Sequence, residues 1–139
     1  MTAPLAGLKI LDFSTLLPGP FATMMLADLG AEVMHVESPT RMDLVRIMPP
    51  YADGQATSHA YLNRNKQSVA LDLKQPACIE QVKQLIGQYD ILVEQFRPNV
   101  MARLGLSYED LKTINPRLIY CSITGYGQTS DYKDRAGHD

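Results

Sequence analysis

The residues best suited to acid–base chemistry stand at the end of the printed sequence, in the run Gly137-His138-Asp139. A histidine takes up and releases a proton near neutral pH, so His138 is a candidate general base. Asp139 is its direct neighbour, and adjacent side chains of an extended segment point to opposite faces. We therefore expect that Asp139 does not orient His138, and the sequence defines no Ser/His/Asp or Cys/His nucleophile set.

Two further groups of residues follow apolar runs that predict strands. Lys74 closes residues 71–74, and Gln95, Phe96 and Arg97 follow the next strand-like run. A phenyl ring can stack on a heteroaromatic base, and a guanidinium pairs with phosphate through two parallel hydrogen bonds. Because parallel strands end at one edge of a sheet, these groups are expected to share a ligand-binding edge. The alternative, an apolar plug beside solvated cations, stays open.

Glycine spacing bears on the type of cofactor. The first strand-to-helix turn, residues 14–20, contains one glycine, Gly19. A dinucleotide fingerprint needs several glycines so that the backbone can approach a pyrophosphate. NAD or FAD in that mode is therefore not expected, and we predict no tightly bound cofactor. A second glycine-containing run, residues 125–130, has no clear helix after it, and we interpret it as a surface loop.

Short apolar runs and helix signals alternate along the chain. Strands are predicted at residues 8–13, 31–37, 67–73, 90–94 and 117–124. A helix is predicted after Pro20, because Phe21, Met25, Leu26 and Leu29 recur at helical spacing up to Gly30. Further helices are predicted from Pro76 to Gly87, over residues 100–104, and from Ser107 to about Asn115. Residues 38–66 are expected to form a long irregular segment. This alternation predicts an α/β, Rossmann-like fold, a mainly parallel sheet with helices on both faces.

Composition excludes several classes of function. The chain has 139 residues, a net charge of −2 and 45% apolar residues, so neither a nucleic-acid nor a membrane partner is expected. Its two cysteines, Cys78 and Cys121, form no CxxC pair and no pattern with the three histidines. We therefore expect no disulfide framework, no metal site and a reducing, cytoplasmic location.

Short motifs follow one another in a characteristic order along the whole chain. The opening residues 4–13 (PLAGLKILDF) are followed by Pro18-Gly19-Pro20. The other motifs are residues 26–33 (LADLGAEV), 63–66 (NRNK), 71–74 (LDLK), 93–98 (VEQFRP), 103–105 (RLG), 115–119 (NPRLI), 125–128 (GYGQ) and 135–139 (RAGHD). In this order they resemble the family III CoA-transferases, the carnitine CoA-transferase and bile-acid-inducible type.

The resemblance implies that residues 1–139 form the N-terminal, CoA-binding part of a larger and here incomplete domain. It implies coenzyme A or acyl-CoA as the substrate, in an enzyme whose subunits interlock as a homodimer. Carried over motif by motif, the residues expected to contact CoA are Leu71, Asp72, Leu73, Lys74, Gln95, Phe96, Arg97, Arg103, Gly137 and Asp139.

The resemblance leaves two chemistries open. Transferases of the family use an aspartate that attacks the thioester and carries the acyl group as a mixed anhydride. The related 2-methylacyl-CoA racemases exchange the proton at Cα, and there His138 would be one of the bases. In both branches the essential carboxylate follows the Gly-His-Asp motif. The 139-residue chain alone is therefore expected to be inactive, a CoA-binding or assembly unit.

Overall fold

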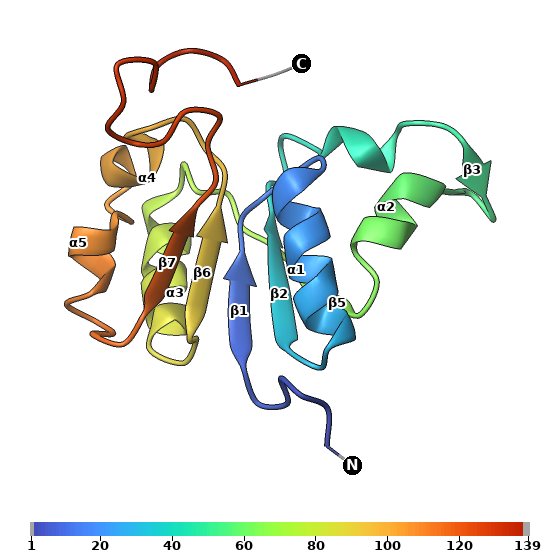
Figure 1. Ribbon diagram of the computed structural model, residues 1–139, viewed down its shortest axis with the longest axis horizontal. Helices are drawn as coiled ribbons and strands as arrows, with labels where there is room; N and C mark the ends of the chain where they lie inside the picture. Colours follow the sequence, from blue (N-terminus) through green and yellow to red (C-terminus); the bar gives the residue numbers. More distant parts are fainter. Residues whose placement is uncertain (1, 138–139) are drawn as a thin grey trace.

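The computed structural model describes residues 2–137, whose core is a five-stranded parallel sheet (Figure 1). The strands are β1 (Lys9–Asp12), β2 (Glu32–Glu37), β5 (Lys66–Ala70), β6 (Ile91–Glu94) and β7 (Ile119–Ser122). Their order in the sheet is β5-β2-β1-β6-β7, and every neighbouring pair is parallel. The chain builds outward from β1 to β5 and then returns to the other side of β1, so the predicted Rossmann-like fold is confirmed.

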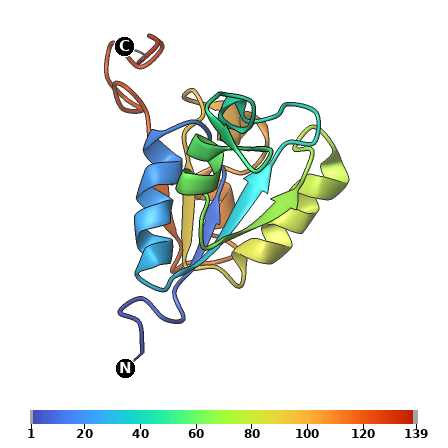
Figure 2. The ribbon, with the colours of Figure 1, turned by 90° about the vertical axis from the view of Figure 1, so that its right-hand side faces the viewer.

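Alternating side chains of the strands divide the apolar core into two layers. On β1, Leu11 belongs to the larger cluster and Ile10 to the smaller one, and both side chains are completely buried. The two layers lie on opposite faces because successive strand residues point in opposite directions. Figure 2 shows α1 (Pro18–Asp28) covering one face and α3 (Pro76–Ile86) covering the other, as predicted.

The face covered by α3 carries most of the core. Helix α3 buries Val82 and Ile86 against it, and the short helices α4 (Val100–Arg103) and α5 (Tyr108–Leu111) add Met101 and Leu111. Ser107 and Asp110 form the expected capping box at the start of α5. Helix α5 ends at Leu111, sooner than predicted, and turns continue from there towards Asn115.

Helix α1 packs in a way that its apolar spacing did not predict. Its small residues, Thr23 and Ala27, face the sheet and are buried, so the helix lies close to β1 and β2. Of the four larger residues that predicted the helix, Leu26 packs against the core, whereas Phe21, Met25 and Leu29 point outward and remain 42%, 51% and 46% exposed. Periodicity therefore located the helix correctly, whereas close packing decided which of its residues face the sheet.

The segment between β2 and β5 is more ordered than the sequence suggested. It contains the 3-10 turn η1 (Leu44–Arg46), the hairpin of β3 (Tyr51–Ala52) with β4 (Gln55–Ala56), and helix α2 (Thr57–Leu62). The prediction of a long irregular segment was therefore wrong in part, because these short elements contact one another and α1, and Arg46 pairs with Glu37 of β2. Among residues 2–137, no helix is long and apolar enough to cross a membrane.

Candidate functional site

A hollow of about 380 Å³ lies at the carboxyl edge of the sheet. Strands β1 and β6 are neighbours there, and the chain leaves them in opposite directions, which is where open α/β sheets bind ligands. The hollow is lined by Pro18, Gln95, Phe96, Arg97, Pro98, Ile123, Thr124, Gly125, Lys133, Arg135 and Gly137. Three loops therefore form it, those that follow β1, β6 and β7.

Gln95 connects the loop after β6 with the loop after β1. Its Nε2 donates to the carbonyl oxygen of Thr15 at 2.5 Å, and its Oε1 accepts from the backbone N–H of Gly19 at 3.2 Å. Both ends of the side-chain amide are thus engaged with the backbone. Gln95 holds the first turn of α1 against the hollow, in addition to lining it.

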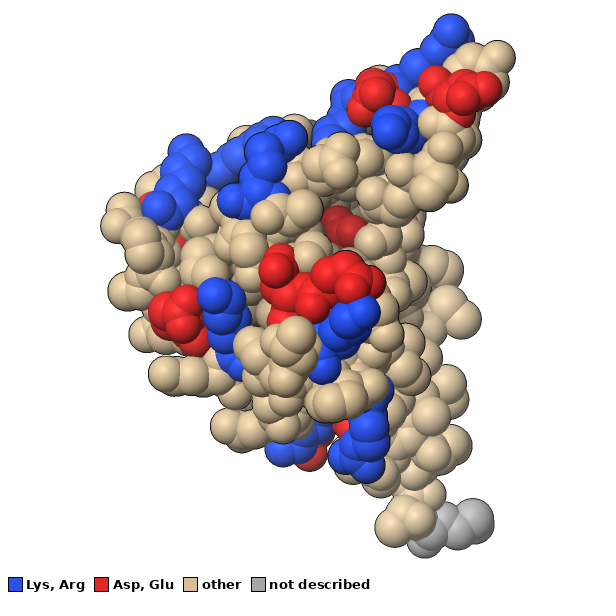
Figure 3. All heavy atoms as spheres, turned by 90° about the vertical axis from the view of Figure 1, so that its left-hand side faces the viewer, with Lys and Arg blue, Asp and Glu red and all other residues tan. Residues whose placement is uncertain are grey.

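Positive side chains gather at the same edge. Arg97 Nη1 donates to the carbonyl oxygen of Asp134 at 3.3 Å, which ties the loop after β6 to the loop after β7. The Arg135 guanidinium lies 4.5 Å from the centre of the Tyr132 ring. Lys133 lines the hollow with them. Figure 3 shows Lys and Arg side chains at the upper end of the face that carries β7 and α5, with acidic side chains among them in the projecting part.

The loop after β7 folds back on itself at two glycines, Gly125 and Gly137. A Cβ atom added to Gly125 would lie 2.5 Å from the Cα of Gly137, and one added to Gly137 would meet Gly125 in the same way. Only glycine lets the two backbones approach this closely. Residues 125–130 form a largely exposed loop without helix or strand, as interpreted, and Gly125 at its start also forms part of one wall of the hollow.

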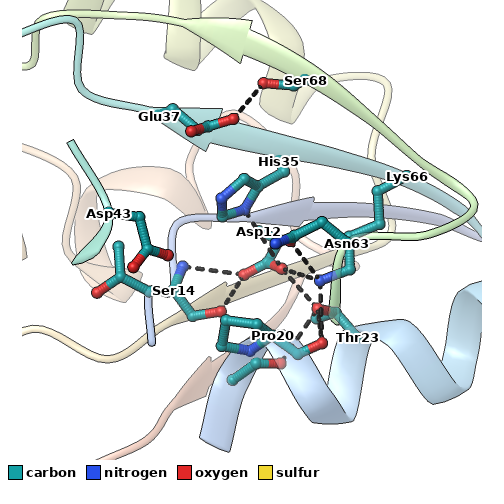
Figure 4. Close-up of polar contacts among 12 residues, drawn as sticks. Asp12, Ser14, Pro20, Thr23, His35, Glu37, Asp43, Asn63, Lys66 and Ser68 are labelled. Carbon is teal, nitrogen blue, oxygen red and sulfur yellow. Dashed lines mark hydrogen bonds and ion pairs between the residues drawn. The ribbon is translucent and has the colours of Figure 1, made fainter. Parts of the chain in front are cut away.

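A buried polar cluster lies beneath the first loop, around Asp12 at the end of β1 (Figure 4). The Asp12 carboxylate accepts from the backbone N–H of Ser14 at 2.9 Å, from the Ser14 hydroxyl, and from Thr23 Oγ1 at 2.5 Å. Lys66 Nζ lies 3.4 Å from Asp12 Oδ2 and His35 Nδ1 lies 3.6 Å from it. The cluster fastens α1 and β5 to the centre of the sheet.

The charges of this cluster depend on one another. Burial by itself would raise the pKa of Asp12, but the His35 imidazole and the Ser14 and Thr23 hydroxyls lower it to about 2. Burial lowers the pKa of Lys66, and the Asp12 carboxylate opposes that shift. Lys66 Nζ also donates to the carbonyl oxygen of Pro20 at 2.9 Å and so reaches the start of α1.

Asp43, from the segment between β2 and β5, also holds the loop between β1 and α1 in place. Its carboxylate accepts from the backbone N–H groups of Leu16, at 3.1 Å, and Val45, also at 3.1 Å. Leu16 has a positive φ of 61°, an unfavourable conformation for leucine that this contact helps to hold. Nearby, Arg46 binds the Glu37 carboxylate through two hydrogen bonds of 2.7 and 2.6 Å, which anchors η1 to β2.

The residues predicted to contact CoA fall into separate groups. Gln95, Phe96, Arg97 and Gly137 line the hollow together, although Phe96 also packs partly against the core. Strand β5 ends at Ala70, so Leu71, Asp72, Leu73 and Lys74 form the turn after it, with β2 and β1 between them and β6. Leu71 is buried in the core and Leu73 packs against it.

Three predicted residues lie away from the hollow or outside the described residues. Arg103 is exposed at the end of α4 and does not line the hollow. His138 and Asp139 lie outside the described residues. In the sequence these two residues directly follow Gly137, which lines the hollow.

The sequence interpretation overlooked several residues that the structure makes central. Asp12 carried a usable signal, because a carboxylate closing an apolar strand is rarely buried without partners. Lys66 was quoted only as the last residue of the motif 63–66, and Asp43 lay in the segment expected to be irregular. Lys133 carried no local signal and Arg135 only its place in the motif 135–139, because the folding back of their loop is what brings both to the hollow.

A parallel sheet with a hollow where its strand order reverses, and with no dinucleotide fingerprint, defines a Rossmann-like α/β protein. The chain belongs to CoA-transferase family III, whose sequence model matches residues 5–139. It is 47% identical over 137 residues to the succinyl-CoA:glutarate CoA-transferase of Homo sapiens. It is 45% identical over 143 residues to the succinate–glutarate CoA-transferase of Agrobacterium fabrum.

A solved structure agrees with these sequence relatives. The crystal structure of a CaiB/BaiF family protein from Brucella suis superimposes with a TM-score of 0.92 at 40% identity, covering 100% of this chain and 38% of that one. The matches to the human and Agrobacterium enzymes each cover 98% of this chain, but 31% and 36% of those proteins. The chain thus spans about a third of the length of its relatives.

Proposed function

We propose that residues 1–139 are the N-terminal, CoA-binding part of an enzyme that transfers CoA between an acyl-CoA thioester and a free carboxylic acid. The observation that carries the proposal is the hollow, where Gln95, Phe96, Arg97 and Gly137 come together at the ligand-binding edge of a family III sheet. The names of the relatives support a transferase over a racemase, because those of the human and Agrobacterium enzymes state CoA transfer.

In this proposal the hollow binds acyl-CoA as a substrate, with no tightly bound cofactor. Gln95 fixes the loop after β1, Arg97 supplies positive charge, and Gly137 lets the last loop close over the ligand. His138 would exchange protons beside the thioester. None of the described residues that line the hollow carries a carboxylate, so the aspartate nucleophile that the family's transferases use is not among them. We further propose a cytoplasmic homodimer as the working form.

Isothermal titration calorimetry of the 139-residue chain with CoA tests the binding role. Saturable binding of one CoA per chain is expected, and the absence of any binding would refute the proposal. The transfer reaction is tested in a chimeric enzyme in which this chain replaces the matching N-terminal third of a full-length relative. The assay measures transfer of CoA from succinyl-CoA to glutarate. Deuterium wash-in at Cα without an acceptor acid would instead identify a racemase.

Gly125→Ala should weaken CoA binding about tenfold or more, because the new methyl group would push the Gly137 backbone out of the wall of the hollow. The thermal midpoint should change little, since this loop packs outside both core clusters. Gly87→Ala is the matched control: its added methyl group would meet nothing nearer than 3.6 Å, so CoA binding should stay unchanged. Equal affinities of the Gly125→Ala and Gly87→Ala chains would contradict the assignment.

A further inference from the structure

Leu16 has an unusual backbone conformation for an apolar residue. It is one of four non-glycine residues between 2 and 137 with a positive φ, which is 61° at Leu16. The other three are Asp53, Asn65 and Asn99, and these two residue types tolerate the conformation because their short polar side chains hydrogen-bond locally. A leucine has no such compensation. Strained residues of this kind cluster at functional sites, where the surrounding structure holds them.

The conformation of Leu16 sets the path of the loop between β1 and α1. Pro18 lines the hollow at the carboxyl edge of the sheet. Leu17 lines a second, apolar hollow of about 520 Å³ between α1 and α2. With an ordinary negative φ at Leu16, the chain after it would turn in another direction and carry both residues away from these walls. One backbone angle therefore shapes two neighbouring hollows.

Asp43 is the side chain that holds Leu16 in this conformation. Its two carboxylate oxygens accept the Leu16 N–H at 3.3 and 3.1 Å, although the residues are 27 positions apart in the sequence. The same carboxylate accepts the N–H of Val45 at 3.1 Å and thereby caps η1. Figure 4 shows Asp43 beside the loop that carries Ser14. The contact thus joins the segment between β2 and β5 to the first loop.

Within residues 2–137, Asp43 has no ion-pair partner to offset its burial, although it is only 6% exposed. Arg46 lies nearby but pairs with Glu37. Lys66 also lies nearby but pairs with Asp12. A buried carboxylate without a paired cation depends on its hydrogen bonds for compensation. Because a charged acceptor binds an N–H group more strongly than a neutral one, it is well suited to hold a strained residue.

We propose that Asp43 is a positioning residue for substrate binding, which acts on the ligand through the backbone of Leu16. Asp43 lines neither hollow, so its effect on affinity is indirect. The inference rests on the proposed function, because it requires that CoA binds beside the loop between β1 and α1. It also gives the segment between β2 and β5 a role: a displacement of η1 would release Leu16 and lower the affinity for CoA.

Calorimetric titration with CoA compares the unmodified chain with Asp43→Ala, Leu16→Gly and the double variant. Asp43→Ala should weaken CoA binding about tenfold, because the strain of a non-glycine residue at positive φ is then no longer balanced. Glycine adopts a positive φ without steric cost. Leu16→Gly should therefore return the affinity of the Asp43→Ala chain to within about threefold of the unmodified value. A general loss of structure would not be repaired in this way.

Asp90→Ala is the matched control. Asp90 also accepts a backbone N–H from a distant segment, that of Lys9 at 2.9 Å, but it lies before β6, at the opposite edge of the sheet. Both alanine variants should lower the urea midpoint, whereas only Asp43→Ala should lower the affinity for CoA. If the Asp43→Ala chain does not fold, Asp43→Asn replaces it. Its amide keeps an acceptor oxygen without the charge, so a smaller loss, again restored by Leu16→Gly, is expected.

Equal CoA affinities of the Asp43 and Asp90 variants would overturn the positioning role. A loss of affinity that Leu16→Gly leaves unchanged would also overturn it, because Asp43 would then act by another route. In both cases CoA binding by the unmodified chain leaves the proposed function standing. An unmodified chain that does not bind CoA would remove the proposed function and the positioning role together.

Discussion

Replacing Asp12 with alanine should lower the free energy of unfolding by about 3–5 kcal/mol, the usual cost of removing one partner from a buried ion pair. Lys66, whose side chain is 1% exposed, would lose its carboxylate partner in the core. Ser14 would lose the acceptor of its hydroxyl group, and the Thr23 hydroxyl would keep only the carbonyl oxygens of Gly19 and Pro20. Urea unfolding followed by circular dichroism measures the change.

Asp28→Ala is a suitable control, because it breaks the Arg64–Asp28 pair at the surface and should cost far less. A similar loss for the two variants would show that the cluster around Asp12 contributes no more than a surface pair. Asp12→Ala should also weaken CoA binding, because the first turn of α1 is tied to Asp12 through Thr23.

The same carboxylate predicts how stability depends on pH. Its pKa is about 2 in the folded chain and 3.8 without the fold, so the unfolded state binds the proton more readily. The contribution of Asp12, about 2 kcal/mol, is therefore complete above pH 4 and is lost as the pH falls towards 2. Unfolding free energies measured at several pH values should fall less steeply for Asp12→Ala in this range. An unchanged acid dependence in that variant would contradict the assignment.

Gly19→Ala is expected to have the second large effect, about 3 kcal/mol of stability together with loss of CoA binding. The added methyl group would overlap the side chain of Ser14 and approach Gln95 Oε1 to 2.9 Å. Ser14 is fully buried and bonded to Asp12, so it has no free position to move to. Helix α1 would have to shift away from the strand ends that form the hollow.

A double-mutant cycle with Ser14→Gly tests this cause. Removing the Ser14 side chain makes room for the new methyl group, so the double variant should be less destabilised than the sum of the two single variants. Additive losses would show that the cost of Gly19→Ala does not come from contact with Ser14. Urea midpoints and CoA titrations of all four chains supply the measurements.

Local sequence patterns determined the elements of this protein and their order. The apolar runs located all five strands of the parallel sheet, and Pro76 and Gly87 bounded α3, because backbone preferences act over a few residues. The Ser107 capping box was likewise readable from four residues. The motif order placed the chain in its family and identified Gln95, Phe96, Arg97 and Gly137 as candidate ligand contacts.

The tertiary structure alone decided which of these residues meet. Leu71 is buried in the core and Leu73 packs against it, on the turn after β5, which β2 and β1 separate from β6. The outward face of α1 and the pairing of Asp12 with Lys66 follow from the packing of segments that are far apart in the chain. The closure of Gly125 on Gly137, which carries Lys133 and Arg135 to the hollow, is likewise a contact between backbones. Such contacts depend on shape and burial across the whole sheet, which a pattern of neighbouring residues does not encode.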